Sequence, residues 1–155
     1  MDRRETTTLI ARLLIARLER DAARIAHAFS LRYRAIEPER PQVRRRLGVC
    51  YRDGTIRIRL FHATTGQALK YSSLVDTLCH ELAHLRHFNH GRRFQAFYRR
   101  ILEYARREAI YQPGPDQATR DETVRHLVAA PRPPTRTKAA AAAAARPLPQ
   151  QLVLF

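Results

Sequence analysis

The sequence contains few cysteines, no long apolar run and little acidic charge. Its two cysteines, Cys50 and Cys79, are too few for a disulfide framework, which favours a reducing compartment. The longest uncharged apolar run, 139–145, is far shorter than the ~20 residues of a transmembrane helix. The N-terminal residues are charged and lack the apolar segment of a secretory signal. We therefore expect a cytoplasmic protein with no membrane partner.

The scarcity of acidic residues leaves a strong positive charge. The 155 residues include 29 Lys and Arg but only 14 Asp and Glu, a formal net charge of +15. Lysine occurs only as Lys70 and Lys138, so 27 of the basic residues are arginines. Residues 1–111 carry 23 basic and 11 acidic side chains. Because the arginine fork binds phosphate bidentately, nucleic acid is the favoured partner, although a solvated surface without a partner fits the same composition.

Hydrophobic periodicity and turn signals predict a mixture of helices and short strands. Apolar residues at helical spacing mark three helices, and alternating apolar and charged residues mark the strands. Asp53-Gly54 is typical of a type I′ hairpin turn, and Ser73 with Asp76 matches a capping box at a helix start. The predicted elements are a helix over 6–29, a strand over 30–36, a hairpin over 49–60, a helix over 73–88 and a helix over 92–111.

The composition changes after Tyr111. A Gln-Pro-Gly-Pro segment stops the last predicted helix, and a stretch rich in Pro, Ala and Arg follows it. This stretch has no amphipathic pattern that would pack it against a folded body. We therefore predict a folded domain over 1–111, a flexible linker over 112–150 and a C-terminal peptide over 151–155.

The motif His80-Glu81-Leu82-Ala83-His84 lies in the predicted helix 73–88. Residues four apart share a helix face, so the two imidazoles can bind one zinc ion at Zn–N distances of ~2.0–2.1 Å. The carboxylate of Glu81 can then reach a water molecule at the site without binding the metal, as the general base of a metalloprotease does. The competing interpretations are two surface histidines without a metal, and a closed structural zinc site.

Two later histidines compete for the third ligand position. If the helix continues, His87 shares a face with His80 and His84, but its Cα lies ~10.5 Å along the axis from His80. One ion cannot easily be bound by three imidazoles from three consecutive turns of a helix. His90 lies beyond the predicted break before Gly91, so the chain can turn it back toward the metal. We therefore predict one zinc ion bound by His80, His84 and His90, with His87 as the alternative third ligand.

The metal motif and its surroundings resemble the SprT-like zinc metallopeptidases. The similarity extends over 8–111 and is strongest over 73–97, where the motif is followed by His-Phe-Asn-His-Gly-Arg-Arg-Phe. This resemblance implies an α+β, minigelatinase-like core: an N-terminal helix, a small three-stranded antiparallel sheet, a zinc-binding helix and a C-terminal helix. The composition after Tyr111 predicts a disordered tail behind this core. The resemblance also implies peptide hydrolysis, with Glu81 as the base and with the ligands His80, His84 and His90.

Clustered arginines are candidate contacts with DNA. No base-reading motif is present, so we expect binding to the phosphate backbone without sequence specificity. Each arginine taken alone fits a solvated surface charge better than a DNA contact. The candidate contacts are Arg44, Arg45, Arg46, Arg57, Arg59, Arg92 and Arg93.

The last five residues, Gln-Leu-Val-Leu-Phe, form an apolar segment after the polar linker. Such a segment is typical of a docking peptide. It resembles the bacterial sliding-clamp-binding peptide, whose pattern is Gln-Leu-x-Leu-Phe. The matching residues are Gln151, Leu152, Leu154 and Phe155. The alternative is a C-terminal strand that folds back onto the body.

Together these features predict a zinc-dependent endopeptidase that acts on DNA-bound or DNA-crosslinked proteins. The pentapeptide would recruit it to the sliding clamp, and we therefore expect a cytoplasmic, nucleoid-associated protein. One alternative is a zinc metallopeptidase whose substrates are unrelated to DNA. Another is a non-catalytic, zinc-stabilised adaptor for DNA and the clamp, although an adaptor has no use for Glu81.

Overall fold

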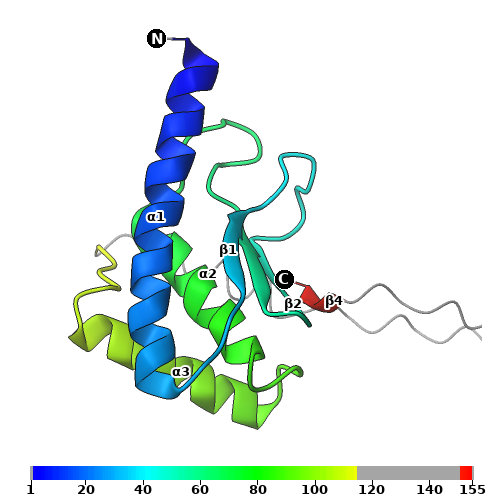
Figure 1. Cartoon of the computed structure of the whole chain (residues 1–155), viewed down its shortest axis with the longest axis vertical. Helices are drawn as coiled ribbons and strands as arrows, with labels where there is room; N and C mark the ends of the chain where they lie inside the picture. The colour runs from blue at the N-terminus through cyan, green and yellow to red at the C-terminus, as the bar shows by residue number, and fades with distance from the viewer. Residues whose placement is uncertain (1, 115–150, 155) are drawn as a thin grey trace, which may run out of the picture.

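The computed structural model describes residues 2–114 and 151–154 (Figure 1). Its central helix is α2, which contacts the sheet and both other helices. Within the described residues, no helix has the length and apolar character needed to cross a membrane. The elements in chain order are α1 (Arg3–Phe29), β1 (Ala35–Pro38), β2 (Gly48–Tyr51), β3 (Thr55–Ile58), α2 (Tyr71–His84), α3 (Arg92–Arg107) and β4 (Gln151–Leu154).

Helix α1 is amphipathic, and its C-terminal half supplies part of the core. Leu18, Ala22 and Ile25 follow one another at helical spacing and are fully buried. The N-terminal half extends beyond the other elements (Figure 1). There Leu9 and Leu13 are 46% and 63% exposed. The helix is therefore anchored to the body mainly through its second half.

The sheet is mixed, with the strand order β1-β3-β2-β4. Strands β2 and β3 form the predicted antiparallel hairpin, and Gly54 adopts a φ of 85° in its turn, which glycine tolerates without a Cβ clash. Strand β1 pairs with β3 in parallel, so the predicted antiparallel arrangement is wrong for this pair. In the sheet β3 lies between β1 and β2. The hairpin makes β2 and β3 antiparallel, but β1 pairs with the other side of β3 and runs in the same direction as β3.

The hydrophobic core lies between the sheet and the helices. Alternate hairpin residues such as Ile56 and Ile58 face it and are fully buried, as the alternating pattern predicts. Helix α2 is buried continuously from Leu74 to His84. Because this helix carries the metal motif, the fold places that motif inside the molecule rather than on its surface.

Helix α2 begins and ends earlier than the predicted helix 73–88. Its N-cap is Lys70, so Ser73 lies inside the helix and is not the predicted capping residue. The helix ends at His84, and the chain then follows an irregular path until α3 begins after Gly91. The backbone N–H of His87 still bonds to the carbonyl of Ala83, which closes the last turn. This early end frees the loop that carries the third predicted ligand.

A fourth strand comes from the C-terminal segment. The backbone of β4 pairs antiparallel with β2, and Leu154 lies opposite Val49 (Figure 1). The strand that folds back onto the body, the alternative interpretation of the pentapeptide, is therefore the arrangement in the structure. The predicted linker lies outside the described residues from position 115 onward, and so does Phe155.

Candidate metal centre

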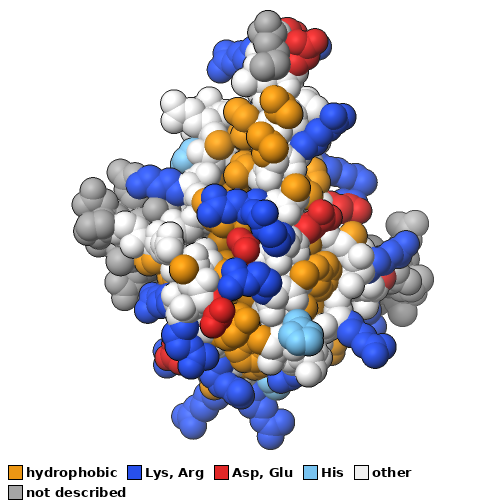
Figure 2. All heavy atoms as spheres, turned by 60° about the vertical axis from the view of Figure 1, so that its left-hand side comes forward, with side chains coloured by type: hydrophobic (Ala, Val, Ile, Leu, Met, Phe, Trp, Pro, Cys, Tyr) orange, Lys and Arg blue, Asp and Glu red, His pale blue; other side chains and the backbone are white. Residues whose placement is uncertain are grey.

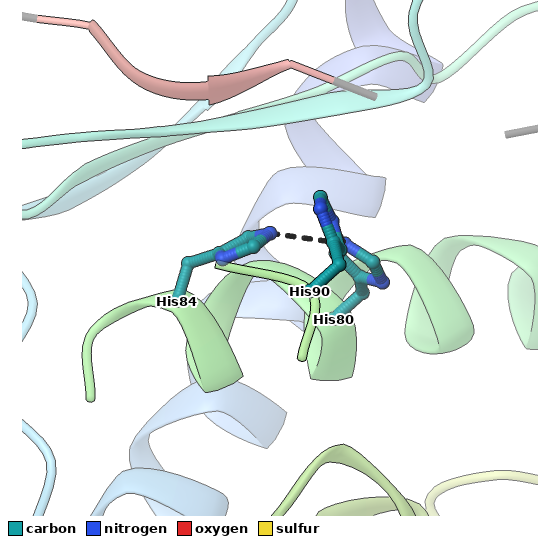
Figure 3. Close-up of side chains that lie close together, drawn as sticks. All are labelled: His80, His84 and His90. Carbon is teal, nitrogen blue, oxygen red and sulfur yellow. Dashed lines mark hydrogen bonds between the residues drawn. The ribbon is translucent and has the colours of Figure 1, made fainter. Parts of the chain in front are cut away.

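Three imidazoles from two segments converge on one point. His80 and His84 lie on adjacent turns of α2, and His90 lies on the loop before α3 (Figure 3). Nε2 of His80 is 3.0 Å from Nε2 of His84 and 3.0 Å from Nε2 of His90. The ligand atoms of all three lie within 4.8 Å of one another. One ion can therefore contact all three rings.

His87 contributes its backbone to this cluster and directs its ring elsewhere. Nδ1–H of His84 donates to the His87 carbonyl at 3.0 Å, which leaves Nε2 of His84 as the unprotonated nitrogen. The His87 ring lies against Phe97 of α3, with the centroids 5.6 Å apart. The structure thus brings His90, rather than His87, to the other two imidazoles.

Helix α3 supplies an apolar wall behind the histidines. Phe94 is fully buried, and its centroid lies 4.7, 4.4 and 4.8 Å from the three imidazole centroids. One turn later Tyr98 packs against His80, and its hydroxyl donates to Asp76. These contacts limit the rotation of the imidazoles, which is how a site keeps its ligands in one geometry.

Burial keeps the imidazoles neutral. Loss of hydration lowers the pKa of His80 and His84, that of His84 to about 4, and the neighbouring imidazoles lower the pKa of His80 further. The same loss lowers the pKa of the more exposed His90. At neutral pH each ring is therefore neutral, which is the state that a metal ligand requires.

Glu81 is a buried carboxylate without a hydrogen-bond partner among the described residues. Its side chain is fully buried, and neither carboxylate oxygen has a hydrogen-bond partner among the described residues. Burial raises the pKa of Glu81 well above the ordinary value of a glutamate, and the positive charge of Arg46 opposes this rise only in part. Because native proteins rarely leave such a group unsatisfied, this carboxyl group points to a chemical role.

Gly48 of β2 makes room for that carboxylate. A Cβ atom at position 48 would lie 2.7 Å from Oε1 of Glu81 and 2.7 Å from Cγ2 of Thr77. Strand β2 therefore crosses directly over Glu81. The sequence prediction missed Gly48, because the predicted hairpin over 49–60 begins one residue after it, whereas β2 begins at Gly48. A glycine within a strand is a known sign of close backbone approach.

The donor set fits a zinc ion. Two ligand nitrogens at ~2.05 Å from zinc and at the tetrahedral angle lie ~3.3 Å apart, and Nε2 of His80 lies 3.0 Å from Nε2 of both His84 and His90. Three neutral imidazoles leave one tetrahedral position open, as in catalytic rather than structural zinc sites. The unpaired carboxylate of Glu81, one residue from the first ligand, is the partner that such an open site needs.

A comparison with protein families now identifies the fold family. The model of the WLM domain matches residues 4–147. The chain belongs to the WLM family. The match includes the metal motif and the elements from α1 to α3 apart from the first residue of α1, and it ends before β4. The resemblance to SprT-like peptidases rested on 8–111.

Solved structures of Wss1 proteins share the fold of this WLM domain. Wss1 from Saccharomyces cerevisiae matches with a TM-score of 0.56 and 22% identity, over 59% of this chain and 73% of its own. A mutant of that protein matches with a TM-score of 0.59 and 20% identity, over 65% of this chain and 84% of its own. A glutamate-to-glutamine mutant of Wss1 from S. pombe matches with a TM-score of 0.53 and 22% identity, over 60% of this chain and 82% of its own. No curated protein matches the sequence. The structural likeness confirms the predicted α+β fold class.

Three of the arginines predicted to contact DNA are engaged within the domain. Arg46 is buried, and its Nε donates to Glu39 at 2.6 Å. Nε of Arg57 donates to Glu37 at 3.0 Å, and Arg59 donates to a backbone carbonyl at 2.7 Å. These guanidinium groups each have a partner in the sheet or its connecting loop, and their contact with DNA stays a prediction.

The other predicted DNA contacts are exposed. Basic side chains are spread over the face shown in Figure 2, and several lie at the lower end, where α3 is located in Figure 1. Two of the exposed candidates belong to the loop before β2. The other two are the first residues of α3 and directly follow the metal loop, residues 85–91, which carries His90. These residues are Arg44, Arg45, Arg92 and Arg93.

Proposed function

We propose that this protein is a zinc-dependent metallopeptidase. The proposal rests on the convergence of three neutral imidazoles next to a buried carboxylate that has no partner in the described chain. His80, His84 and His90 would hold the ion, which when bound supplies Lewis acidity toward a peptide carbonyl. Membership of the WLM family and the fold shared with Wss1 support the proposal.

Glu81 is the residue that we assign to proton transfer. Burial raises its pKa, and so increases its affinity for a proton taken from water and later returned to the leaving amine. Gly48 and Thr77 enclose the carboxylate between β2 and α2. Phe94 and the His87 carbonyl keep the imidazoles in place. The chain thus contributes fixed ligand positions and one proton-transfer group.

The substrate class that we infer is protein bound or crosslinked to DNA. The sequence has a net charge of +15, and the exposed Arg92 and Arg93 follow almost directly after His90. A phosphate backbone bound there would lie close to the metal site. Because phosphate contacts read no bases, selectivity would come from which proteins the DNA holds near the site.

We also propose that residues 151–155 recruit the protein to the bacterial sliding clamp. The four defining residues of the clamp-binding pattern are present. Recruitment of this kind raises the local concentration of the peptidase at DNA without a tight contact to its substrate. It would place the protein at the nucleoid. Deletion of 151–155 should abolish clamp binding in a pull-down, and unchanged binding contradicts the proposal.

The decisive experiment compares the wild type with Glu81→Gln on histone substrate, with and without DNA. Both proteins should bind near one equivalent of zinc, and the variant should cleave at least ~100-fold more slowly, the usual loss for a general base. DNA should stimulate the wild type. Wild-type cleavage by Glu81→Gln contradicts the role of Glu81.

Other outcomes separate the alternative functions. Cleavage that DNA does not affect favours substrates unrelated to DNA. Zinc, DNA and clamp binding without cleavage by the wild type shows a zinc-stabilised adaptor. A protein that does not bind zinc overturns the metallopeptidase proposal itself.

A further inference from the structure

The strand above Glu81 is also the strand that pairs with the C-terminal segment. Gly48 of β2 contacts Glu81, and the next residue, Val49, pairs with Leu154 of β4. In the order β1-β3-β2-β4, β2 would be an edge strand without β4. In Figure 3, β4 runs on the same side of α2 as the imidazoles. The C-terminal segment therefore covers the sheet edge nearest to the proposed base.

The direction of β4 places its C-terminal end beside the start of β2, next to Gly48. The strands are antiparallel, so Leu154 lies opposite Val49 and Gln151 lies opposite Tyr51. The register shifts between Cys50 and Tyr51, which makes the pairing irregular at the end farther from Gly48. The regular part of the pairing is thus the part closest to Glu81.

An open sheet edge binds extended peptides through main-chain hydrogen bonds, whatever their sequence. A substrate paired with β2 would run past Glu81, where the proposed hydrolysis needs it. We propose that residues 151–154 occupy this edge in cis and exclude extended substrates from it, so that the C-terminal segment restrains the peptidase. This inference rests on the proposed function, because a restraint requires an activity.

The pairing between β4 and β2 is short and irregular, so the restraint can be reversed. Strand β4 has four residues, and an irregularity interrupts its register with β2. A short strand held at one edge by backbone pairing can be displaced by another extended segment. A substrate peptide and the C-terminal segment are therefore competitors for the same main-chain groups of β2.

The test compares full-length wild type with three variants. One lacks 151–155, and Val153→Pro removes a backbone N–H and is incompatible with regular strand pairing. Val153→Ala is the matched control, because it keeps the backbone N–H at the same position. Position 153 is the variable position of the clamp-binding pattern, so neither substitution changes a defining residue of that motif.

Two measurements are made on the zinc-loaded proteins. Hydrogen exchange of the amides of β2 should be faster in the deletion and in Val153→Pro than in the wild type and Val153→Ala. The kcat/KM for unstructured casein without DNA should rise three- to tenfold in the same two variants. A synthetic Gln-Leu-Val-Leu-Phe peptide added to the deletion variant should raise KM and leave kcat unchanged.

The exchange data separate failure of this inference from failure of the proposed function. Equal amide exchange in all four proteins shows that β4 does not protect β2, and overturns the inference. Faster exchange with an unchanged kcat/KM shows pairing without restraint, and overturns it as well. Slow exchange in the wild type combined with no cleavage by any protein, although zinc is bound, refutes the peptidase and with it the restraint.

Discussion

At the scale of single residues, the proposed base depends on the absence of a side chain opposite it. Glu81 is fully buried, and the backbone of Gly48 closes one side of its space. The carboxylate has no hydrogen bond from the described chain to hold it. Its position is therefore determined by steric enclosure, so a small change in that enclosure should affect activity before it affects metal binding.

Gly48→Ala tests this dependence. The added methyl group would lie 2.7 Å from a carboxylate oxygen of Glu81, a distance that requires one of the two groups to move. We expect kcat/KM to fall at least tenfold while zinc content stays near one equivalent, as measured by metal analysis and a peptidase assay. Gly114→Ala is the control, because its Cβ meets no atom within 4 Å. Wild-type activity in Gly48→Ala would show that Glu81 tolerates displacement.

His90 and His87 form a matched pair for testing the third ligand. His90→Ala removes a nitrogen 3.0 Å from Nε2 of His80, whereas His87→Ala keeps the carbonyl that binds His84. We expect the first variant to lose most of its zinc under a competing chelator and the second to retain it. Loss of zinc in His87→Ala with retention in His90→Ala would reverse the assignment.

At the scale of elements, hydrophobic periodicity predicted most of the helices and strands. It did not predict the end of α2 or the strand pairing, which depend on contacts between residues far apart in the sequence. The apolar spacing of Leu82, Leu85 and Phe88 continues the helical pattern, yet α2 ends at His84. The three-histidine cluster could still be predicted, because the helical rise disfavours His87 and the break before Gly91 lets His90 turn back, although His87 stayed the alternative ligand. The parallel pairing of β1 and the pairing of β4 depend on strand order, which no local pattern contains.

The connection between β1 and β2 contains an ion pair that the sequence does not reveal. Glu39 has a side-chain exposure of 0% and Arg46 of 10%, and they meet at 2.6 Å. Burial would raise the pKa of Glu39, but the hydrogen bond and charge of Arg46 outweigh it and the pKa is lowered. The pair thus fixes a loop that leads directly into Gly48, the residue above the proposed base.

Glu39→Gln should destabilise the fold by about 3 kcal/mol, because it leaves the buried Arg46 without its charge partner. A lowered pKa in the folded state means that the stabilisation is fully present above the ordinary glutamate pKa and is lost as the pH falls through the lowered value. Urea unfolding at pH 7 and at acidic pH, with zinc in excess, measures both effects. The difference between the wild type and the variant should shrink toward acidic pH.

An exposed ion pair provides the control for that prediction. Arg34 and Asp53 meet at 3.0 Å with side-chain exposures of 68% and 42%. Arg34→Gln should therefore cost less than about 1 kcal/mol. Equal losses in Arg34→Gln and Glu39→Gln would show that burial does not distinguish the two pairs.

At the scale of the whole molecule, the two ends differ in character. Along the projecting half of α1, exposed hydrophobic side chains lie among basic and acidic ones, whereas several basic side chains lie together at the opposite end near α3 (Figure 2). The metal loop joins α2 to α3 at the basic end. If DNA is the partner, this geometry directs the basic end, and with it the metal site, toward the phosphate backbone.

The double substitution Arg92→Gln and Arg93→Gln tests that orientation. Each phosphate contact contributes ~0.9 to the slope of log affinity against log salt for duplex DNA, so the slope should decrease by up to ~2. Fluorescence anisotropy with duplexes of two unrelated sequences measures the slope, which should be the same for both. The control is Arg4→Gln with Arg12→Gln, which removes equal charge from exposed positions on the projecting half of α1. If both double variants reduce the slope equally, net charge alone attracts DNA, and the basic end has no specific part in placing the metal site on it.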